Sequence, residues 1–244
     1  PNAADQLPSD AADLWSADPD GVPAGPMPAQ QANLPQEMET PAGVPDAQAV
    51  TPEPESQSTI VAELTEGEQA AWQAKRSKIK LSIGNQEYAT AAEQIQAARA
   101  DVRTPAQSQQ LEQLSKLREL AQEFHAAMTE AIQGLSPAEV FTVGTSTQAS
   151  FVEGNSQSLS VRIRGQNQTF PLTELPIGLA FAVADLKLDS VHPSDMARRA
   201  AFAVLHPGAI RNELAQSKAR QMMADAVAAG AVSQDMLLIF SDDF

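Results

Sequence analysis

The sequence predicts an α+β protein: a helix-dominated single domain with a small antiparallel β insert and a disordered N-terminal tail. Three observations support this class. Residues 139–176 alternate with the period of two that is typical of strands, and the segments on both sides of them have helical periodicity. Residues 1–58 are acidic and rich in proline. The chain therefore divides into a tether, 1–58, and a domain, 59–244, which contains the β insert.

The tether differs from the rest of the chain in composition. It holds eleven of the 17 prolines and ten Asp or Glu residues, with no Lys or Arg, so it carries −10 of the net charge of −15. Few of its apolar side chains recur with any period, and burial of so few groups cannot repay the entropy of ordering. We expect a disordered acidic linker that spans about 40 Å root-mean-square or more.

Three helices are expected before the insert. Thr65-Glu66-Gly67-Glu68 has the T-x-x-E form of a capping box, and Gly84-Asn85 predicts the end of this first helix. Residues 88–98 carry one apolar stripe, which predicts a second helix. Thr104-Pro105 begins a third, which extends to Gly134.

The third helix contains a heptad seam, because its apolar residues are spaced alternately by three and four. The seam consists of Leu114, Leu117, Ala121, Phe124, Met128, Ala131 and Leu135. We expect it to pack in an intramolecular antiparallel hairpin with the second helix. A coiled-coil dimer is the alternative.

The β insert is predicted to contain three or four short antiparallel strands. Leu159, Val161 and Ile163 alternate with polar residues, so one face of this strand is expected to be buried and the other to expose two arginines. Gly165-Gln166-Asn167 supplies turn residues, and Gln168–Leu172 resumes extended structure. So small a sheet must pack on helices or curl into a small barrel.

Further helices follow the insert. Pro176-Ile177 opens an apolar helix to Leu188, which should form the centre of the core and place Asp185 and Asp189 on one face. Pro193-Ser194-Asp195 begins the next helix, and Pro207-Gly208 ends it. A longer helix is expected from Ala209 to Ala229, with Leu214 among its buried residues, followed by a last helical turn near Leu237.

Two resemblances rest on the β insert and its surroundings. Ala149–Pro176 resembles the short SH3-like β-modules of exported bacterial proteins, with Phe170-Pro171-Leu172-Thr173-Glu174-Leu175 as the closing piece. Tyr88 to Phe240 resembles uncharacterised planctomycete-type bacterial modules that combine a helical hairpin, a GQNxTFPLxxLPxGLA segment and C-terminal helices. This resemblance implies a fold and no known activity.

Composition argues against several classes of function. The chain has no Cys, and its three His residues lie far apart at 125, 192 and 206, so we expect no metal and no cofactor. The net charge of −15 argues against nucleic acid as a partner, and the longest apolar run, 177–184, is too short to insert in a membrane. Because the chain begins with Pro1, we interpret it as a processed or trimmed product, extracytoplasmic or membrane-tethered, whose anchor would lie upstream.

The strongest candidate site is a cluster of polar residues around the end of one predicted strand. Two arginines and two amides there could hold a carboxylate or the edge of an extended peptide: Arg162, Arg164, Gln166 and Asn167. Arg198-Arg199 add two further cations. The alternative is that the arginines form salt bridges with Glu153, Glu174 or the acidic tail.

The histidines favour structural roles. His125 is interpreted as a partly exposed residue of the third helix. His192-Pro193-Ser194-Asp195 holds Ser, His and Asp in sequence, but a catalytic triad is a spatial arrangement, so Ser194 and Asp195 are interpreted as helix-capping residues. His206, before a Pro-Gly stop, is interpreted as a partner of a helix C-terminal dipole.

The function predicted from these features is that of a non-catalytic interaction or scaffold module that binds a protein or peptide. One alternative is a carboxylate-based hydrolase with Glu153 or Glu174 and Asp185 in a cleft between the β insert and the C-terminal helices. Another is a structural protein that self-assembles through the heptad seam. No catalytic residue is assigned, and the oligomeric state stays open.

Overall fold

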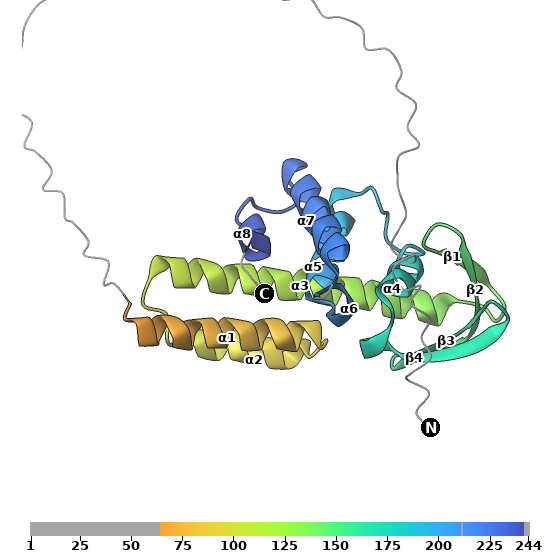
Figure 1. The fold of residues 1–244 in the computed structure, drawn as a ribbon, viewed down its shortest axis with the longest axis horizontal. Helices are drawn as coiled ribbons and strands as arrows, with labels where there is room; N and C mark the ends of the chain where they lie inside the picture. Colours follow the sequence, from red (N-terminus) through yellow and green to blue (C-terminus); the bar gives the residue numbers. More distant parts are fainter. Residues whose placement is uncertain (1–63, 211, 242–244) are drawn as a thin grey trace, which may run out of the picture. The chain divides into compact units, whose positions relative to one another are not determined.

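The computed structural model describes residues 64–210 and 212–241. The predicted tether, 1–58, lies outside the described residues. The described part is dominated by helices and contains one small antiparallel sheet, which confirms the α+β class (Figure 1).

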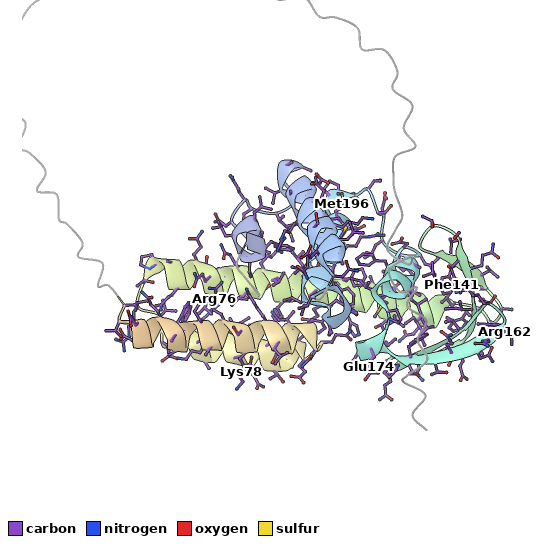
Figure 2. The ribbon with its side chains drawn as sticks, viewed as in Figure 1. Arg76, Lys78, Phe141, Arg162, Glu174 and Met196 are labelled. Carbon is purple, nitrogen blue, oxygen red and sulfur yellow. The ribbon has the colours of Figure 1, made fainter. Side chains whose placement is uncertain are left out.

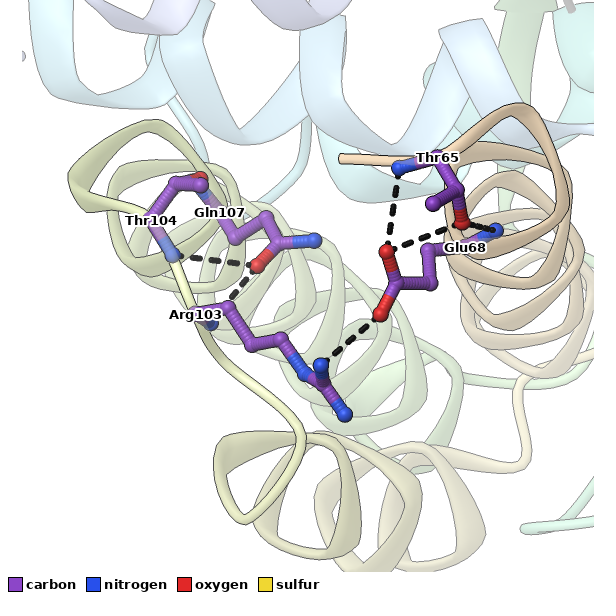
Figure 3. Close-up of polar contacts among 5 residues, drawn as sticks. All are labelled: Thr65, Glu68, Arg103, Thr104 and Gln107. Atoms are coloured by element: carbon purple, nitrogen blue, oxygen red, sulfur yellow. Dashed lines mark hydrogen bonds and ion pairs between the residues drawn. The ribbon is translucent and has the colours of Figure 1, made fainter. Parts of the chain in front are cut away.

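The first helices begin where the sequence signals place them. Helix α1 spans Glu66–Gly84, α2 spans Tyr88–Arg99 and α3 spans Pro105–Gly134. The Thr65 hydroxyl accepts the Glu68 N–H at 3.3 Å, and the Glu68 carboxylate accepts the Thr65 N–H at 3.0 Å (Figure 3). Each partner therefore satisfies a helix-terminal N–H of the other.

A second capping box starts α3. The Thr104 hydroxyl accepts the Gln107 N–H at 3.2 Å. The Gln107 side chain accepts the Thr104 N–H, also at 3.2 Å (Figure 3). Arg103 donates to the Glu68 carboxylate at 2.8 Å, which joins the beginnings of α1 and α3 (Figure 3). Proline occupies the first helical position of α3, as predicted.

Helix α3 runs through both parts of the hydrophobic core. Its first half packs with α1, α2 and the C-terminal helices, and its second half packs under the sheet (Figure 1). The seam residues from Leu114 to Ala131 are at most 2% exposed, and Leu135 is half-buried. The seam thus packs inside this chain, against α2 and other elements, and this burial leaves little of it for self-assembly.

The sheet is a four-stranded meander with the order β1-β2-β3-β4. Its strands are β1 (Val140–Val143), β2 (Thr147–Gly154), β3 (Ser158–Ile163) and β4 (Gln166–Pro171). All three strand pairs are antiparallel, and β1 is not paired with β4, so the sheet is open instead of closing into a barrel. Of the two predicted solutions, the sheet takes the first and buries one face on α3 and α4.

After the sheet, the remaining elements run back along α3 (Figure 1). They are the 3₁₀ turn η3 (Leu172–Glu174), α4 (Ile177–Ala184), α5 (Pro193–Leu205), α6 (Pro207–Ile210), α7 (Glu213–Ala228) and α8 (Met236–Ser241). Helix α5 packs against both α3 and α7.

Two of the helix boundaries differ from those predicted. The apolar helix ends at Ala184 instead of Leu188, and Leu186 beyond it is 43% exposed. The helix expected over 209–229 is divided, because the Asn212 side chain accepts the Ala215 N–H at 3.1 Å and so starts α7 anew. The Leu214 side chain, predicted to be buried, is 49% exposed in the first turn of α7.

Candidate functional site

The β3–β4 hairpin turns through two residues, Arg164 and Gly165, whose φ angles are 51° and 82°. Two successive positive φ angles define the tight turn whose twist matches antiparallel strands. The turn was predicted at Gly165-Gln166-Asn167, but it lies earlier in the chain, because Gln166 and Asn167 belong to β4. Arg164 therefore belongs to the turn, and the prediction that it shares a strand face with Arg162 is wrong.

Arg162 lies on the solvent face of the sheet, at the sheet end of the domain (Figure 2). Its neighbour Val161 is fully buried on the opposite face. The Arg162 Nε atom donates to Asn167 Oδ1 across the strand pair at 2.9 Å. This bond uses one donor of the guanidinium, and the Arg162 side chain remains exposed.

The expected alternative for these arginines was a salt bridge with Glu153 or Glu174. Within the described ranges, neither Arg162 nor Arg164 lies within ion-pair distance of a carboxylate. Both side chains are exposed, so the hairpin end presents two cations to solvent in a chain of strongly negative net charge. The acidic tail, the third expected partner, lies outside the described residues.

The outer edge of β4 presents backbone groups that sequence reasoning did not single out. In a two-residue hairpin Ile163 and Gln166 form a hydrogen-bonded pair, and hydrogen-bonded pairs then alternate along the strands. Asn167 and Thr169 therefore direct their N–H and C=O groups away from β3. Both residues are exposed, and no other described segment offers these groups a backbone partner.

The register explains why a proline is tolerated in β4. Pro171 falls at the next outward-facing position, so its missing N–H removes no hydrogen bond from the β3–β4 ladder. The next inward-facing residue, Leu172, donates its N–H to the Gln157 carbonyl at 2.9 Å, which confirms the alternation. The edge thus exposes the donors of only two residues before the proline interrupts it.

Arg198 and Arg199 are engaged inside the protein. Arg198 donates to the Glu123 carboxylate at 2.8 Å and also forms an ion pair with Asp195. Arg199 is 6% exposed, forms an ion pair with Asp185 and lies 5.6 Å from the ring centre of Phe181. Burial lowers the pKa of Arg199 to about 10. These two arginines therefore stabilise the packing of α5 and do not add to the exposed cations of the β3–β4 hairpin.

The carboxylates proposed for hydrolysis are not arranged as expected. Asp185 caps the end of α4 and pairs with Arg199, and Asp189 lies beyond the helix, so the two do not share a helix face. Glu153 and Glu174 are exposed. Because Asp185 is engaged by Arg199, it is not available as the acid or base that the hydrolase alternative pairs with either of these groups.

His206 has a different role from the one predicted. Its Nδ1 atom accepts the Gly208 N–H at 3.1 Å, so the ring proton lies on Nε2, which is 3.0 Å from the Leu175 carbonyl and donates to it. The neutral ring is thus held by both nitrogens and cannot serve as a cationic dipole partner. Burial lowers the pKa of His206, and the bond to the Leu175 carbonyl partly offsets this shift.

Asp195 lies in the first turn of α5, where a negative charge is favourable as predicted, but its carboxylate does not cap this helix. Its carboxylate accepts the N–H of Asp189, which precedes α5, at 3.0 Å and pairs with Arg198. His192 is the residue before the helix and makes no side-chain cap. Asp195 therefore links the α4–α5 connection to α5. Its hydrogen bonds go to Asp189 and Arg198 and not to His192 or Ser194, so these three residues do not form a catalytic triad.

The stability of the folded chain is expected to decrease as the pH falls below 6.5. Burial lowers the pKa values of both His125 and His206 below their ordinary 6.5, so the unfolded chain binds these protons first. Their contribution is complete above pH 6.5 and is lost as the pH falls through the lowered pKa values of the folded state. Urea unfolding on both sides of pH 6.5 measures the effect.

The matched comparison for this prediction is His206→Gln. Its side-chain amide retains a donor for the Leu175 carbonyl but does not titrate, so its pH dependence is expected to be shallower. NMR titration of the imidazole provides a direct reading. A His206 that titrates above 6.5 in the folded protein would contradict the burial argument.

A groove of about 630 Å³ lies between α1 on one side and the end of α5 with α6 on the other. One wall carries two cationic side chains of α1, Arg76 and Lys80, and the exposed Leu81. The other wall consists of Leu205, Pro207 and Ile210. Sequence reasoning missed this groove because its walls are more than a hundred residues apart, although Leu81 was a signal: it lies off the buried stripe of α1.

The described residues contain no group of three or more His, Asp or Glu side chains arranged to hold a metal ion. None of the described helices is both long and apolar enough to cross a membrane. Comparisons of the chain with protein-family models, with curated proteins and with solved structures found no match.

Proposed function

We propose that the chain is a non-catalytic interaction module that binds an extended acidic segment of a partner protein along the outer edge of β4. The observation that carries this proposal is the juxtaposition at the hairpin. Outward backbone groups of Asn167 and Thr169 lie beside Arg162 and Arg164, whose side chains are exposed.

The backbone supplies the first part of the binding energy. A strand added beside β4 gains up to four hydrogen bonds from these two residues, and each contributes about 0.5–1.5 kcal/mol net. Pro171 limits the added strand because it offers no N–H. The proposal therefore concerns a short segment bound with modest affinity, to which side-chain contacts must contribute.

The side chains of β4 define the sequence that fits. On the solvent face, Arg162 lies next to Asn167, so a ligand residue at this position would place a carboxylate near the guanidinium. On the opposite face, Phe170 is half-buried against the core and would pack against an apolar ligand residue. Because strand side chains alternate between faces, a segment of alternating acidic and apolar residues fits both.

The expected result for Arg162→Glu is a loss of about tenfold or more in affinity for a short synthetic peptide of alternating glutamate and valine. Charge reversal replaces a charge-assisted hydrogen bond, worth about 1.5–3 kcal/mol, by repulsion. Titration of the ¹⁵N-labelled protein followed by NMR measures affinity and location together. Lys78→Glu is the matched control, since it makes the same charge change on α1, far from the sheet (Figure 2).

A pair of proline substitutions separates edge binding from simple charge attraction. Thr169→Pro deletes an outward N–H and keeps the β3–β4 ladder, so it should weaken peptide binding while the sheet stays folded. Gln168→Pro deletes an inward N–H and should disrupt the sheet itself. If Thr169→Pro binds the peptide as the unmodified chain does, the edge is not the binding surface.

A further inference from the structure

The two exposed arginines of the β3–β4 hairpin suit an acidic segment that the chain itself contains. Residues 1–58 carry ten carboxylates and no Lys or Arg, so their side chains can pair only with cations of the domain. Within the described ranges neither Arg162 nor Arg164 forms an ion pair. Both are exposed next to the outward backbone groups of β4. Charge and a free strand edge therefore coincide at this hairpin.

One short part of residues 1–58 matches the side-chain pattern proposed for the ligand. Asp13, Leu14 and Trp15 follow one another, and Trp15 is the only aromatic residue of this segment. In an added strand Asp13 and Trp15 would fall on one face, about 7 Å apart, and Leu14 on the other. The acid and the indole ring would then share the solvent face with the arginines, and Leu14 would share the face of Phe170.

Both groups on the solvent face are suitable partners for a guanidinium. A carboxylate forms charge-assisted hydrogen bonds with arginine, and the indole is the aromatic ring that attracts a cation most strongly. Tryptophan and arginine are also among the residues that contribute most to binding energy at interfaces. On the other face, Phe170 is half-buried and packs against the core, so its remaining surface is available to Leu14.

The chain between this segment and the domain has a suitable length. A hydrogen bond from Arg103 to Glu68 joins the starts of α1 and α3, and the sheet packs on the second half of α3. Helix α3 has 30 residues and is about 45 Å long, so this is the distance from the start of α1 to the sheet. A flexible coil with the length of residues 16–63 spans about 40 Å root-mean-square.

The same length argument separates this segment from another that alternates acidic and apolar residues, Glu37-Met38-Glu39. A coil with the length of residues 40–63 spans only about 27 Å root-mean-square. Effective concentration is greatest when the span of the linker matches the distance between the sites. The comparison therefore favours residues 13–15 over residues 37–39.

We propose that Asp13-Leu14-Trp15 is an intramolecular ligand of the β4 edge, which a partner must displace. The inference rests on the proposed function of this edge and adds its regulation. With an effective concentration of about 1 mM and a dissociation constant of about 0.1 mM, the occupied form outnumbers the free form by about ten to one. An external peptide then binds about tenfold more weakly than it would to a free edge.

The contact is measured by ¹⁹F NMR of the full chain labelled with 5-fluorotryptophan. The chain has two tryptophans, and Trp72, which is 6% exposed in the helical core, serves as the internal reference. The Trp15 signal is expected to differ from that of a synthetic peptide of residues 10–18 labelled in the same way. A Trp15 signal that coincides with that of the free peptide would overturn the proposal.

Variants of the domain locate the contact. Arg162→Glu and Thr169→Pro should each shift the Trp15 signal toward that of the free peptide, because the first reverses a charge and the second removes an outward N–H. Lys78→Glu on α1 makes the same charge change as Arg162→Glu and should leave the signal in place. Equal shifts for Lys78→Glu and Arg162→Glu would show attraction by general charge and reject the site.

Binding of the glutamate–valine peptide separates this inference from the proposed function. The double variant Leu14→Ser/Trp15→Ser should bind the peptide at β4 about tenfold more tightly than the unmodified chain, and Met38→Ser should bind it equally. If the double variant and the unmodified chain bind the peptide equally at β4, the intramolecular ligand is rejected and the proposed function stands. If neither binds the peptide at β4, the proposed function fails as well.

Discussion

Phe124→Ala is expected to lower the free energy of unfolding by about 3–5 kcal/mol, which is the usual cost of removing a buried aromatic ring. The Phe124 side chain is completely buried on α3, where the two parts of the core meet. Its ring stacks on Phe202, with centroids 4.4 Å apart, and meets the edge of Phe181 at 5.6 Å. Removal therefore leaves a cavity at the junction of α3, α4 and α5.

Guanidinium unfolding followed by circular dichroism measures this loss. Phe124→Leu, which fills much of the cavity, should cost less than half as much, and Leu81→Ala, at a side chain that is 65% exposed, should change stability by at most about 0.5 kcal/mol. If Phe124→Ala lowers the stability less than Phe124→Leu does, the neighbouring rings collapse into the space and the cavity argument fails.

Helix starts could be predicted because their signals are local. Thr65 and Thr104 each precede a residue three positions later whose side chain completes a capping box, and both helices begin there. The end of α4 could not be predicted in the same way. Leu188 is buried, so the apolar pattern continues past Ala184 even though the helix does not. Hydrophobic pattern reports burial, and the length of a helix needs a separate stop signal.

The break between α6 and α7 had a local signal that was passed over. Asn212 followed by Glu213 is a helix start, but the helix-forming residues on both sides favoured one continuous element. The consequence is visible at Leu214, which the continuous helix would have buried. At this boundary the capping signal of Asn212 conflicts with the apolar periodicity, and the structure follows the capping signal.

The candidate site was predicted in part. The alternation in β3 correctly placed Arg162 and Val161 on opposite faces of the sheet, because successive side chains of a strand point to opposite faces. Arg164 was misplaced because a non-glycine residue with positive φ is uncommon, and the turn was assigned to the glycine and asparagine that favour it. The groove could not be predicted, since its lining residues come from two segments, 73–85 and 205–210, that only the tertiary fold brings together.

Asp185→Ala is expected to destabilise the protein by about 2 kcal/mol, which is less than the roughly 3–5 kcal/mol for a fully buried pair because the Asp185 side chain is 44% exposed. The cost arises on the other partner. Arg199 is almost completely buried, and its guanidinium would retain the nearby Phe181 ring but no carboxylate. A buried cation without its counter-ion loses solvation and regains little of it.

This explanation is tested by whether Arg199→Met lowers the stability less than Asp185→Ala does. Methionine keeps much of the apolar stem and removes the buried charge, so its cost should stay within about 1 kcal/mol, well below that of Asp185→Ala. The double variant should then be no less stable than Asp185→Ala alone. Glu130→Ala provides a control, because it breaks an exposed pair with Lys187 at 2.9 Å and should cost at most about 0.5 kcal/mol. A larger loss for Arg199→Met than for Asp185→Ala would mean that the arginine stabilises α5 by packing, and that the ion pair adds little.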